Sequence, residues 1–549
     1  MDLTSVSHLP PHSCLGLALM LLVLLVTEGD APAAGAPPSE LRRNANSTSL
    51  AVKGYPFLVL GAQCDIWRST LQDARTLAFL DGYQEMNATT VSVGIPWSKI
   101  EPEEGKYDFS FMDWFIKQSE VRGLRLVLNL FNSNVCGKVE EVSGGGAYPQ
   151  YAPTYILSDP GKYRRMRLPG PYKYVAGGPP LCPNDPNTLE RERLLVARVA
   201  EHLKAQDRRG TVVMLQIDNE FYYQQWEGER PKDERAVRCL CAACEVEWAK
   251  GGYSCGEDFM FRSFARYAKT LTDTVARVYD LPVYLNSPWW DPAVVSIFLE
   301  TCPNLDLVGI DGVFDPQEPN MLSRSQVGRN IPFAAENPTE NPKTRLNLDT
   351  LPYYTVLGRM GIGNLLWECG PPHTVVEDPV ARKRYGDALY PLKNAMAPIA
   401  RARGTERLLG WYALRDVVQE TTTDVFGNLV PSKPEGSIAE KARLFLREGT
   451  WSRVQEGTSL ETRLGKVPVA VTDSSAGVII RTGEREMVVA VPHGTVTLTL
   501  PGRATAEEGR FQGDHWRAES PFNLRAEGRR YTLSFTGPKV VKVTWRSGG

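Results

Sequence analysis

The chain of 549 residues is 42% hydrophobic and 23% charged, an ordinary globular composition that excludes a mainly disordered or collagen-like chain. Its length predicts about two to four domains, or one large barrel with an accessory domain. A formal net charge of −2 argues against nucleic acid as a partner, and six histidines are too few for chemistry that needs many histidine ligands.

The amino-terminal segment is typical of a secretory signal peptide. Residues 15–26 form an apolar run that is shorter than the ~20 residues of a membrane-spanning helix, and small residues follow it. We expect residues 1–34 to be a signal peptide and the mature protein to be secreted, extracellular or periplasmic; an uncleaved signal anchor is the alternative. The sequons at Asn46 and Asn87 fit a secreted glycoprotein. No other apolar run predicts a stable membrane span.

Residues 35–52 are rich in Pro, Ala, Ser and Asn and are expected to be a linker. Residues 53–405 then alternate β-branched or leucine-rich runs with amphipathic helical patterns, which predicts repeated β/α units. Eight such units favour an α/β fold, a (β/α)8 TIM barrel. A doubly wound sheet is the alternative, although the first run lacks a glycine-rich phosphate loop. The runs cover residues 56–64, 89–97, 124–131, 211–220, 282–288, 305–313, 331–337 and 362–370.

Three further segments differ in composition or pattern from the repeated β/α units. The long connection at 132–188 is rich in Gly, Pro and Tyr, and in a barrel it would lie over the site. Residues 406–460 are expected to connect two domains, with a helix-like stretch at 441–448. Residues 461–549 alternate apolar and polar positions between polar turns, which predicts a C-terminal antiparallel β-sandwich.

Carboxylates occur where several of the predicted strands end, and this is where barrels place reactive side chains. The fourth run ends in Asp218-Asn219-Glu220, the seventh in Glu336-Asn337 and the eighth in Trp367-Glu368. Two carboxylates are enough to cleave a glycosidic bond, because one protonates the leaving oxygen and the other attacks or activates water. Glu220 is the strongest candidate; the alternative without a catalytic role is an acid at a helix N-terminus or a member of an ion pair at the barrel rim.

The fourth run, LQIDNEF, resembles the Asn-Glu signature of clan A glycoside hydrolases, which are retaining (β/α)8 enzymes. Residues 96–113 resemble the second β/α loop of the family 35 and family 42 β-galactosidases, and a looser similarity extends over residues 55–400. The resemblance implies that Glu220 is the acid/base, and that Asn219 binds the sugar 2-hydroxyl.

The nucleophile of this family follows strand seven, which implies Glu336. Glu368 is the alternative if residues 408–416 are the true eighth strand, and Glu340 lies nearby in a Pro-rich loop. Further candidates for sugar binding are polar or aromatic residues at the strand ends, with Trp367 as a platform for the apolar face of a sugar. They are Trp97, Glu101, Asn129 and Trp367, followed by Asn132, Asn286, Trp289 and Trp290.

Ten cysteines are present, and three of them form the run Cys239-Leu-Cys241-Ala-Ala-Cys244. Three thiolates at this spacing can bind one tetrahedral ion. Cys182 matches the family 42 position that supplies the fourth ligand, so the resemblance implies a structural zinc at Cys182, Cys239, Cys241 and Cys244. The alternative is a disulfide between Cys244 and Cys255, because secretion favours oxidation. No cofactor is expected for catalysis.

These features predict a secreted, retaining, exo-acting glycoside hydrolase, most similar to a β-galactosidase, that acts on a galactoside or a related oligosaccharide. The alternatives are another clan A exo-glycosidase, of the β-glucosidase, β-mannosidase or arabinosidase type, and a non-catalytic carbohydrate-binding protein on the same frame. A metal-dependent or serine hydrolase is disfavoured, because only His202 and His373 lie in the barrel and no GxSxG motif occurs. The sequence leaves the oligomeric state open, and a homo-oligomer is compatible with it.

Overall fold

The computed structural model describes most of the chain after residue 37. The described residues are 38–43, 48–64, 72–132, 139–142, 146–148, 151–168, 172–173, 179–219, 225–226, 238–287, 291–311, 327–331, 333–338, 348–357, 362–367, 375–416, 421–423, 429–431, 439–448, 451–456 and 459–546. The predicted signal peptide and the sequon at Asn46 lie outside them. Among the described helices, none combines the length and the apolar character that a membrane span requires.

Eight parallel strands close into a barrel, which confirms the predicted α/β fold. Their order around the barrel follows the chain, and the last strand pairs with the first. Every run predicted as a barrel strand forms one, and residues 408–416 lie in another sheet, so the alternative eighth strand is wrong. The barrel strands are β4 (Val59–Cys64), β5 (Thr90–Pro96), β6 (Arg125–Phe131), β10 (Val212–Asn219), β12 (Val283–Ser287), β13 (Leu307–Asp311), β14 (Ala334–Pro338) and β15 (Gly363–Trp367).

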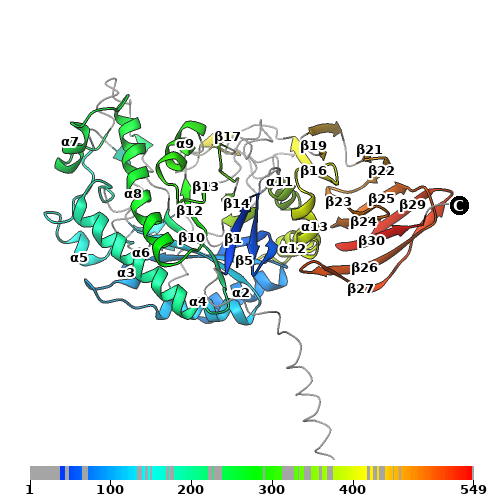
Figure 1. The fold of residues 1–549 in the computed structure, drawn as a ribbon, viewed down its shortest axis with the longest axis horizontal. Helices are drawn as coiled ribbons and strands as arrows, with labels where there is room; N and C mark the ends of the chain where they lie inside the picture. Colours follow the sequence, from blue (N-terminus) through cyan, green and yellow to red (C-terminus); the bar gives the residue numbers. More distant parts are fainter. Residues whose placement is uncertain are drawn as a thin grey trace, which may run out of the picture. The chain divides into compact units, whose positions relative to one another are not determined.

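Helices between the strands cover the outside of the barrel (Figure 1). Several begin at an aspartate whose side chain accepts a hydrogen bond from a first-turn N–H, as at Asp73, Asp185, Asp291 and Asp378. The described helices are α2 (Ala74–Glu85), α3 (Trp97–Ile100), α4 (Ser110–Val121), α5 (Thr154–Leu157), α6 (Pro186–Gln206), α7 (Ala242–Trp248), α8 (Gly256–Val278), α9 (Pro292–Thr301), α11 (Leu351–Leu357), α12 (Pro379–Asn394) and α13 (Met396–Ala402).

The predicted linker at 35–52 contains two strands, so this expectation is wrong where they lie. A small antiparallel sheet is formed by β1 (Ser39–Arg43), β2 (Thr48–Val52) and β3 (Tyr55–Phe57). Leu50 and Val52 pack with residues that begin the barrel strands, among them Val59 and Val213. The sheet therefore covers the amino-terminal end of the barrel, opposite the end where the candidate site lies.

The C-terminal part contains an eight-stranded and a five-stranded antiparallel sheet with a shared apolar core, as the predicted sandwich requires. The larger sheet holds β20 (Trp451–Glu456), β19 (Ala439–Glu448), β16 (Leu408–Asp416), β23 (Ala476–Gly483), β24 (Glu486–Val491), β30 (Lys539–Trp545), β26 (Ala504–Gln512) and β27 (His515–Phe522). The smaller holds β21 (Leu460–Leu464), β22 (Val467–Thr472), β25 (Gly494–Thr499), β29 (Arg530–Phe535) and β28 (Arg525–Glu527).

Three strands of the larger sheet come from the predicted connecting segment at 406–460. The stretch at 441–448, expected to be helix-like, lies in strand β19, because β16 and β20 pair with it on both sides. Three short antiparallel pairs complete the described strands: β7 (Val139–Val142) with β8 (Gly146–Tyr148), β9 (Tyr172–Lys173) with β11 (Gln225–Trp226), and β17 (Thr421–Thr423) with β18 (Leu429–Pro431).

Within residues 38–549, one apolar cluster joins the barrel helices to the larger sheet. It includes Leu389 and Leu392 of α12 together with Val488 and Val540 of the sheet. At Gly410 of β16, an added Cβ would lie 2.4 Å from a methyl group of Leu357, so a larger residue would have to push this buried α11 side chain aside.

Candidate active site

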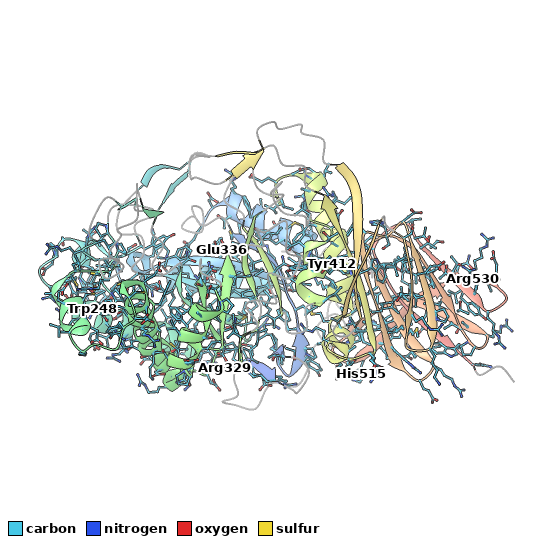
Figure 2. All side chains as sticks on the ribbon, turned by 90° about the horizontal axis from the view of Figure 1, so that it is seen from above. Trp248, Arg329, Glu336, Tyr412, His515 and Arg530 are labelled. Carbon is cyan, nitrogen blue, oxygen red and sulfur yellow. The ribbon has the colours of Figure 1, made fainter. Side chains whose placement is uncertain are left out.

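Glu336, the predicted nucleophile, lies on strand β14 among the side chains of the barrel (Figure 2). It is half-buried, and Gln63 Nε2 donates a 2.7 Å hydrogen bond to its Oε1 atom. Gln63 belongs to β4, and β15 separates β4 from β14 in the barrel. The bond therefore reaches past a strand and shows that the Glu336 carboxylate faces the barrel axis.

An irregularity in β14 explains this orientation. From Ala334 to Asn337 the strand uses three steps where β15 uses two, so β14 carries one extra residue. Phe333 and Ala335 pack in the barrel interior, and strict alternation would turn the next side chain, Glu336, outward. The extra residue changes this alternation and brings Glu336 to the inside, as bulges near active sites commonly do.

Asn219, the predicted ligand for the sugar 2-hydroxyl, is the last residue of β10. Its Oδ1 atom accepts hydrogen bonds from Gln216 Nε2 at 3.0 Å and from Asn286 Nδ2 at 3.2 Å. These two bonds fix the side chain at the carboxyl end of strand four, beside strand five. Glu220, Glu340 and Glu368 lie outside the described residues, so the distance between the two predicted catalytic carboxylates is not described.

Buried amides and hydroxyls line the same end of the barrel. Asn129 of β6 accepts a 3.1 Å hydrogen bond from the hydroxyl of Tyr284 of β12. Among the described residues, no hydrogen-bond partner is found for Gln216 Oε1, Asn286 Oδ1 or Ser92 Oγ. Buried polar atoms normally have partners, so this lining is able to bind a ligand rich in hydroxyl groups or ordered water.

Glu101 and Trp97, predicted to bind sugar, are instead buried in a structural network. Glu101 is 0% exposed and accepts hydrogen bonds from Trp97 Nε1 at 2.9 Å and from the backbone N–H of Gly105 at 2.8 Å. Its carboxylate also forms an ion pair with Arg191 of α6. These contacts engage both carboxylate oxygens and hold the loop after strand two against α6, so we assign both residues a packing role.

The remaining sugar-binding candidates differ in how much is described. Asn286 lies beside Asn219, whereas the Asn132 amide donates to the backbone carbonyl of Ile217 at 2.7 Å. Trp367 ends β15, but its side chain, like Trp289 and Trp290, lies outside what is described. Gln63 was missed by the sequence analysis, which looked for acids at the strand ends. Its place next to the end of strand one was the available signal.

The four predicted zinc ligands come together. The Sγ atoms of Cys182, Cys239, Cys241 and Cys244 all lie within 4.8 Å of one another, and all four residues are buried. Cys182 Sγ lies 3.3 Å from that of Cys244 and 3.4 Å from that of Cys241. A disulfide needs about 2.05 Å, whereas four sulfurs at about 2.3 Å from a zinc ion lie about 3.8 Å apart. The donor set therefore fits a tetrahedral metal ion better than a disulfide.

The surroundings of the cluster also suit thiolate ligands. The backbone N–H of Arg167 and the side-chain amide of Asn184 donate to Cys239 Sγ and Cys244 Sγ at 3.2 and 3.4 Å. The four thiols are coupled to one another: hydrogen bonds within the cluster lower the pKa of Cys239 and Cys241 and raise the pKa of Cys182. Cys255 is a free thiol that caps α8, so the alternative disulfide between Cys244 and Cys255 is wrong.

Comparison with known proteins supports the predicted resemblance. Residues 72–249 match the family model of glycoside hydrolase family 42, described as β-galactosidase. This span includes Asn219, Glu220 and the cysteine cluster, and it ends before Glu336. No curated protein matches the chain.

Several solved glycoside hydrolases have similar structures at low sequence identity. A β-galactosidase from Bacillus circulans sp. alkalophilus has a TM-score of 0.45 and 11% identity, covering 89% of this chain and 99% of its own. Endo-glycoceramidase II from Rhodococcus sp. has a TM-score of 0.40 and 11% identity, covering 90% and 98%. A β-mannanase from the blue mussel Mytilus edulis has a TM-score of 0.41 and 13% identity, covering 66% and 97%. With its closed (β/α)8 barrel and the match over residues 72–249, this chain resembles the clan A glycoside hydrolases of family 42.

Proposed function

We propose that this protein is a retaining glycoside hydrolase of the β-galactosidase type, with Glu220 as acid/base and Glu336 as nucleophile. The observation that carries the proposal is the Glu336 carboxylate, which β14 turns toward the barrel axis and Gln63 holds at 2.7 Å. Asn219 supports it from strand four, because two amides fix its side chain next to the position of Glu220 in the sequence.

In this mechanism Glu220 protonates the glycosidic oxygen while Glu336 attacks the anomeric carbon and forms a covalent glycosyl-enzyme. Glu220 then removes a proton from water, which releases the sugar with its original configuration. The Gln63 amide stabilises Glu336 as an anion and fixes one of its oxygens, which prepares the carboxylate for in-line attack. Retention requires the two carboxyl groups to lie about 5–5.5 Å apart.

A panel of nitrophenyl glycosides tests the activity and the sugar together. We expect hydrolysis of the β-galactoside, and a loss of at least about 10³-fold in kcat for Glu336→Gln. Glu220→Gln should lose as much on a glycoside with a poor, alcohol leaving group that is assayed beside the panel, because this leaving group needs a proton. Glu300→Gln is the matched control, since Glu300 is exposed near the end of α9. NMR of the first-formed anomer reports retention or inversion.

The outcomes separate the alternatives. Preference for a β-glucoside, β-mannoside or arabinoside keeps the mechanism and changes the sugar. Binding of a monosaccharide without hydrolysis of any substrate in the panel would favour the non-catalytic alternative. Wild-type turnover in Glu336→Gln would exclude Glu336 as the nucleophile and direct attention to Glu368 and Glu340.

We also propose that the cysteine cluster holds a structural zinc ion. Zinc at these four thiolates would supply no step of the reaction; it would tie the segment before α6 to the start of α7. Metal analysis of the purified protein should find about one zinc per chain, and Cys239→Ala should lose it and unfold at a lower temperature. Cys302→Ala is the control, because Cys302 is a buried free thiol outside the cluster.

Secretion remains a proposal based on the amino-terminal segment. Expression in a secreting host should release a product whose amino terminus lies near residue 35. A product that retains residues 15–26 and stays with the membrane would instead support the signal-anchor alternative.

A further inference from the structure

Strand β10, like β14, carries one extra residue close to its carboxyl end. Between Gln216 and Asn219 it takes three steps, while the paired strand β12 takes two, from Tyr284 to Asn286. Gln216 and Asn219 both face the same amide network, although an odd spacing would place them on opposite faces of a regular strand. The bulge thus turns Asn219 inward and turns Asp218 toward the helices.

The Asp218 carboxyl group repairs the hydrogen bonding that the bulge disturbs. Its Oδ1 atom accepts the backbone N–H of Asn219 at 3.0 Å. A buried N–H is destabilising unless it finds an acceptor, so the Asp218 carboxyl group stabilises the bulge at this place. Asp218 is 1% exposed, which makes it an unusual residue to bury for this purpose alone.

Side chains from three other elements surround this position. Tyr267 of α8 lies close enough to Asp218 and to Glu192 of α6 for both carboxylates to act on its hydroxyl. Asn132, which follows β6, donates from Nδ2 to the carbonyl of Ile217 at 2.7 Å and to the Tyr267 hydroxyl at 3.4 Å. The end of β10 is therefore connected to α6, α8 and β6 by buried polar contacts.

The charged and titratable groups here, among the described residues, are the two carboxyl groups and one phenol. Burial raises the pKa of Asp218 to about 8, and the hydrogen bond from Asn219 lowers it only in part. Burial also raises the pKa of Tyr267. No cation is among these groups, so a neutral, protonated Asp218 suits this environment.

We propose that Asp218 is a positioning residue that holds the bulge at the end of β10 and thereby sets the direction in which Asn219 is presented. The inference rests on the proposed function for its effect on catalysis. Its structural part, the support of the bulge by the Asp218 carboxyl group, stands without it. A protonated Asp218 keeps the Oδ1 acceptor without adding a buried negative charge.

Two substitutions separate the acceptor from the charge. Asp218→Ala removes the acceptor, so we expect kcat to fall about 100-fold with KM changed less than threefold, because a displacement of about 1 Å has this effect. Asp218→Asn keeps a carbonyl oxygen of the same shape and should restore kcat to within about fivefold of wild type. It should also shift the pH profile of kcat, because it removes a titrating group two residues before Glu220 in the sequence.

Asp207→Ala is the matched control at the other end of the same strand. Asp207 is also a buried carboxylate, and it accepts the N–H groups of Thr211 and Val212 at 2.8 and 2.7 Å. This variant should lower the melting temperature while its kcat stays within twofold of wild type. A loss of kcat equal to that of Asp218→Ala would show that any weakening of β10 lowers turnover, which would overturn the positioning role.

Hydrogen exchange gives a readout that does not depend on activity. Peptides covering residues 212–219 should exchange faster in Asp218→Ala than in wild type, and Asp218→Asn should restore protection. If Asp218→Ala fails to fold, Tyr267→Phe keeps the shape of the cluster and should show a smaller change of the same kind. Unchanged exchange and unchanged kcat in a folded Asp218→Ala protein would refute the inference. If the variants show the expected changes in hydrogen exchange but the wild-type protein hydrolyses no glycoside, only the proposed function is refuted.

Discussion

The clearest pH-dependent prediction concerns the buried carboxyl group of Asp218. Its pKa is raised from 3.8 to about 8 in the folded protein, chiefly because burial penalises the charged form. Unfolded chains lose this proton near pH 4, whereas the folded protein keeps it up to about pH 8. The folded state then binds more protons in this window, so this group makes the protein less stable as the pH rises from about 4 to about 8.

The size of the effect follows from the shift. About four pKa units, at about 1.4 kcal/mol per unit, set an upper limit near 6 kcal/mol. Relaxation of the cluster and entry of water reduce this value, so we expect about 2–4 kcal/mol. Asp218→Asn removes the titration without changing the shape of the side chain, and its stability relative to wild type should rise by this amount between pH 4.5 and pH 8.5.

Urea unfolding at a series of pH values, followed by fluorescence and circular dichroism, measures the effect. The difference in urea midpoint between Asp218→Asn and wild type should be small at pH 4.5 and should grow steadily up to pH 8.5. Glu300→Gln, which removes an exposed carboxylate, should show no such trend. If the two proteins change in parallel over the whole range, Asp218 does not hold a proton that the unfolded chain releases, and the argument from burial fails.

Three further outcomes follow from individual contacts. Gln63→Leu removes the donor to Glu336, so kcat should fall about 10- to 100-fold with little change in KM, which steady-state kinetics will measure. Glu101→Gln should lower stability by about 2–4 kcal/mol, because Arg191 loses its buried charge partner, while KM should stay near the wild-type value; a large rise in KM would restore Glu101 as a sugar ligand. Asn87 donates from its side-chain amide to the carbonyl of Gly386 at 3.3 Å, so mass spectrometry of secreted protein should find this sequon unmodified, and a glycan there would contradict the packing against α12.

Much of the barrel was predictable because buried parallel strands are apolar on both faces. All eight runs stand out from the amphipathic helices between them, and the strand count placed Glu336 on strand seven. The cysteine run had the spacing of a metal site, and its fourth member, Cys182, came from the family resemblance. The structure brings all four thiols together. Hydrophobic runs, cysteine spacing and the order of strands can all be read along the chain without knowing which distant segments pair.

What the sequence did not show depends on long-range pairing. The stretch at 441–448 contains charged and apolar residues in an order that suits a helix, and only its pairing with β16 and β20 makes it a strand. Glu101 lies in a motif-like loop, but burial against Arg191 decides its role. The bulge at Ile217 and Asp218 leaves no mark in the hydrophobic pattern, because every residue of β10 is buried.

The last prediction concerns Arg403, which follows α13. The side chain is 1% exposed, and none of its three guanidinium nitrogens has a hydrogen-bond partner among the described residues. Burial lowers its pKa to about 10, so the group is still charged at neutral pH and carries the full cost of a desolvated cation.

Replacing Arg403 with a long apolar side chain should therefore stabilise the protein. We expect Arg403→Met to raise the free energy of unfolding by about 1–3 kcal/mol at pH 7, since exchanging a buried ion for an apolar group of similar size is commonly neutral or stabilising. Arg401→Met in the last turn of α13 is the control, because Arg401 is half exposed and its ion pair with Asp514 should be worth less than about 1 kcal/mol. Urea or thermal unfolding will rank the three proteins. A loss of more than about 2 kcal/mol in Arg403→Met, with Arg401→Met near wild type, would mean that buried water or an anion pairs with the guanidinium, and the reasoning from an unpaired charge would not hold.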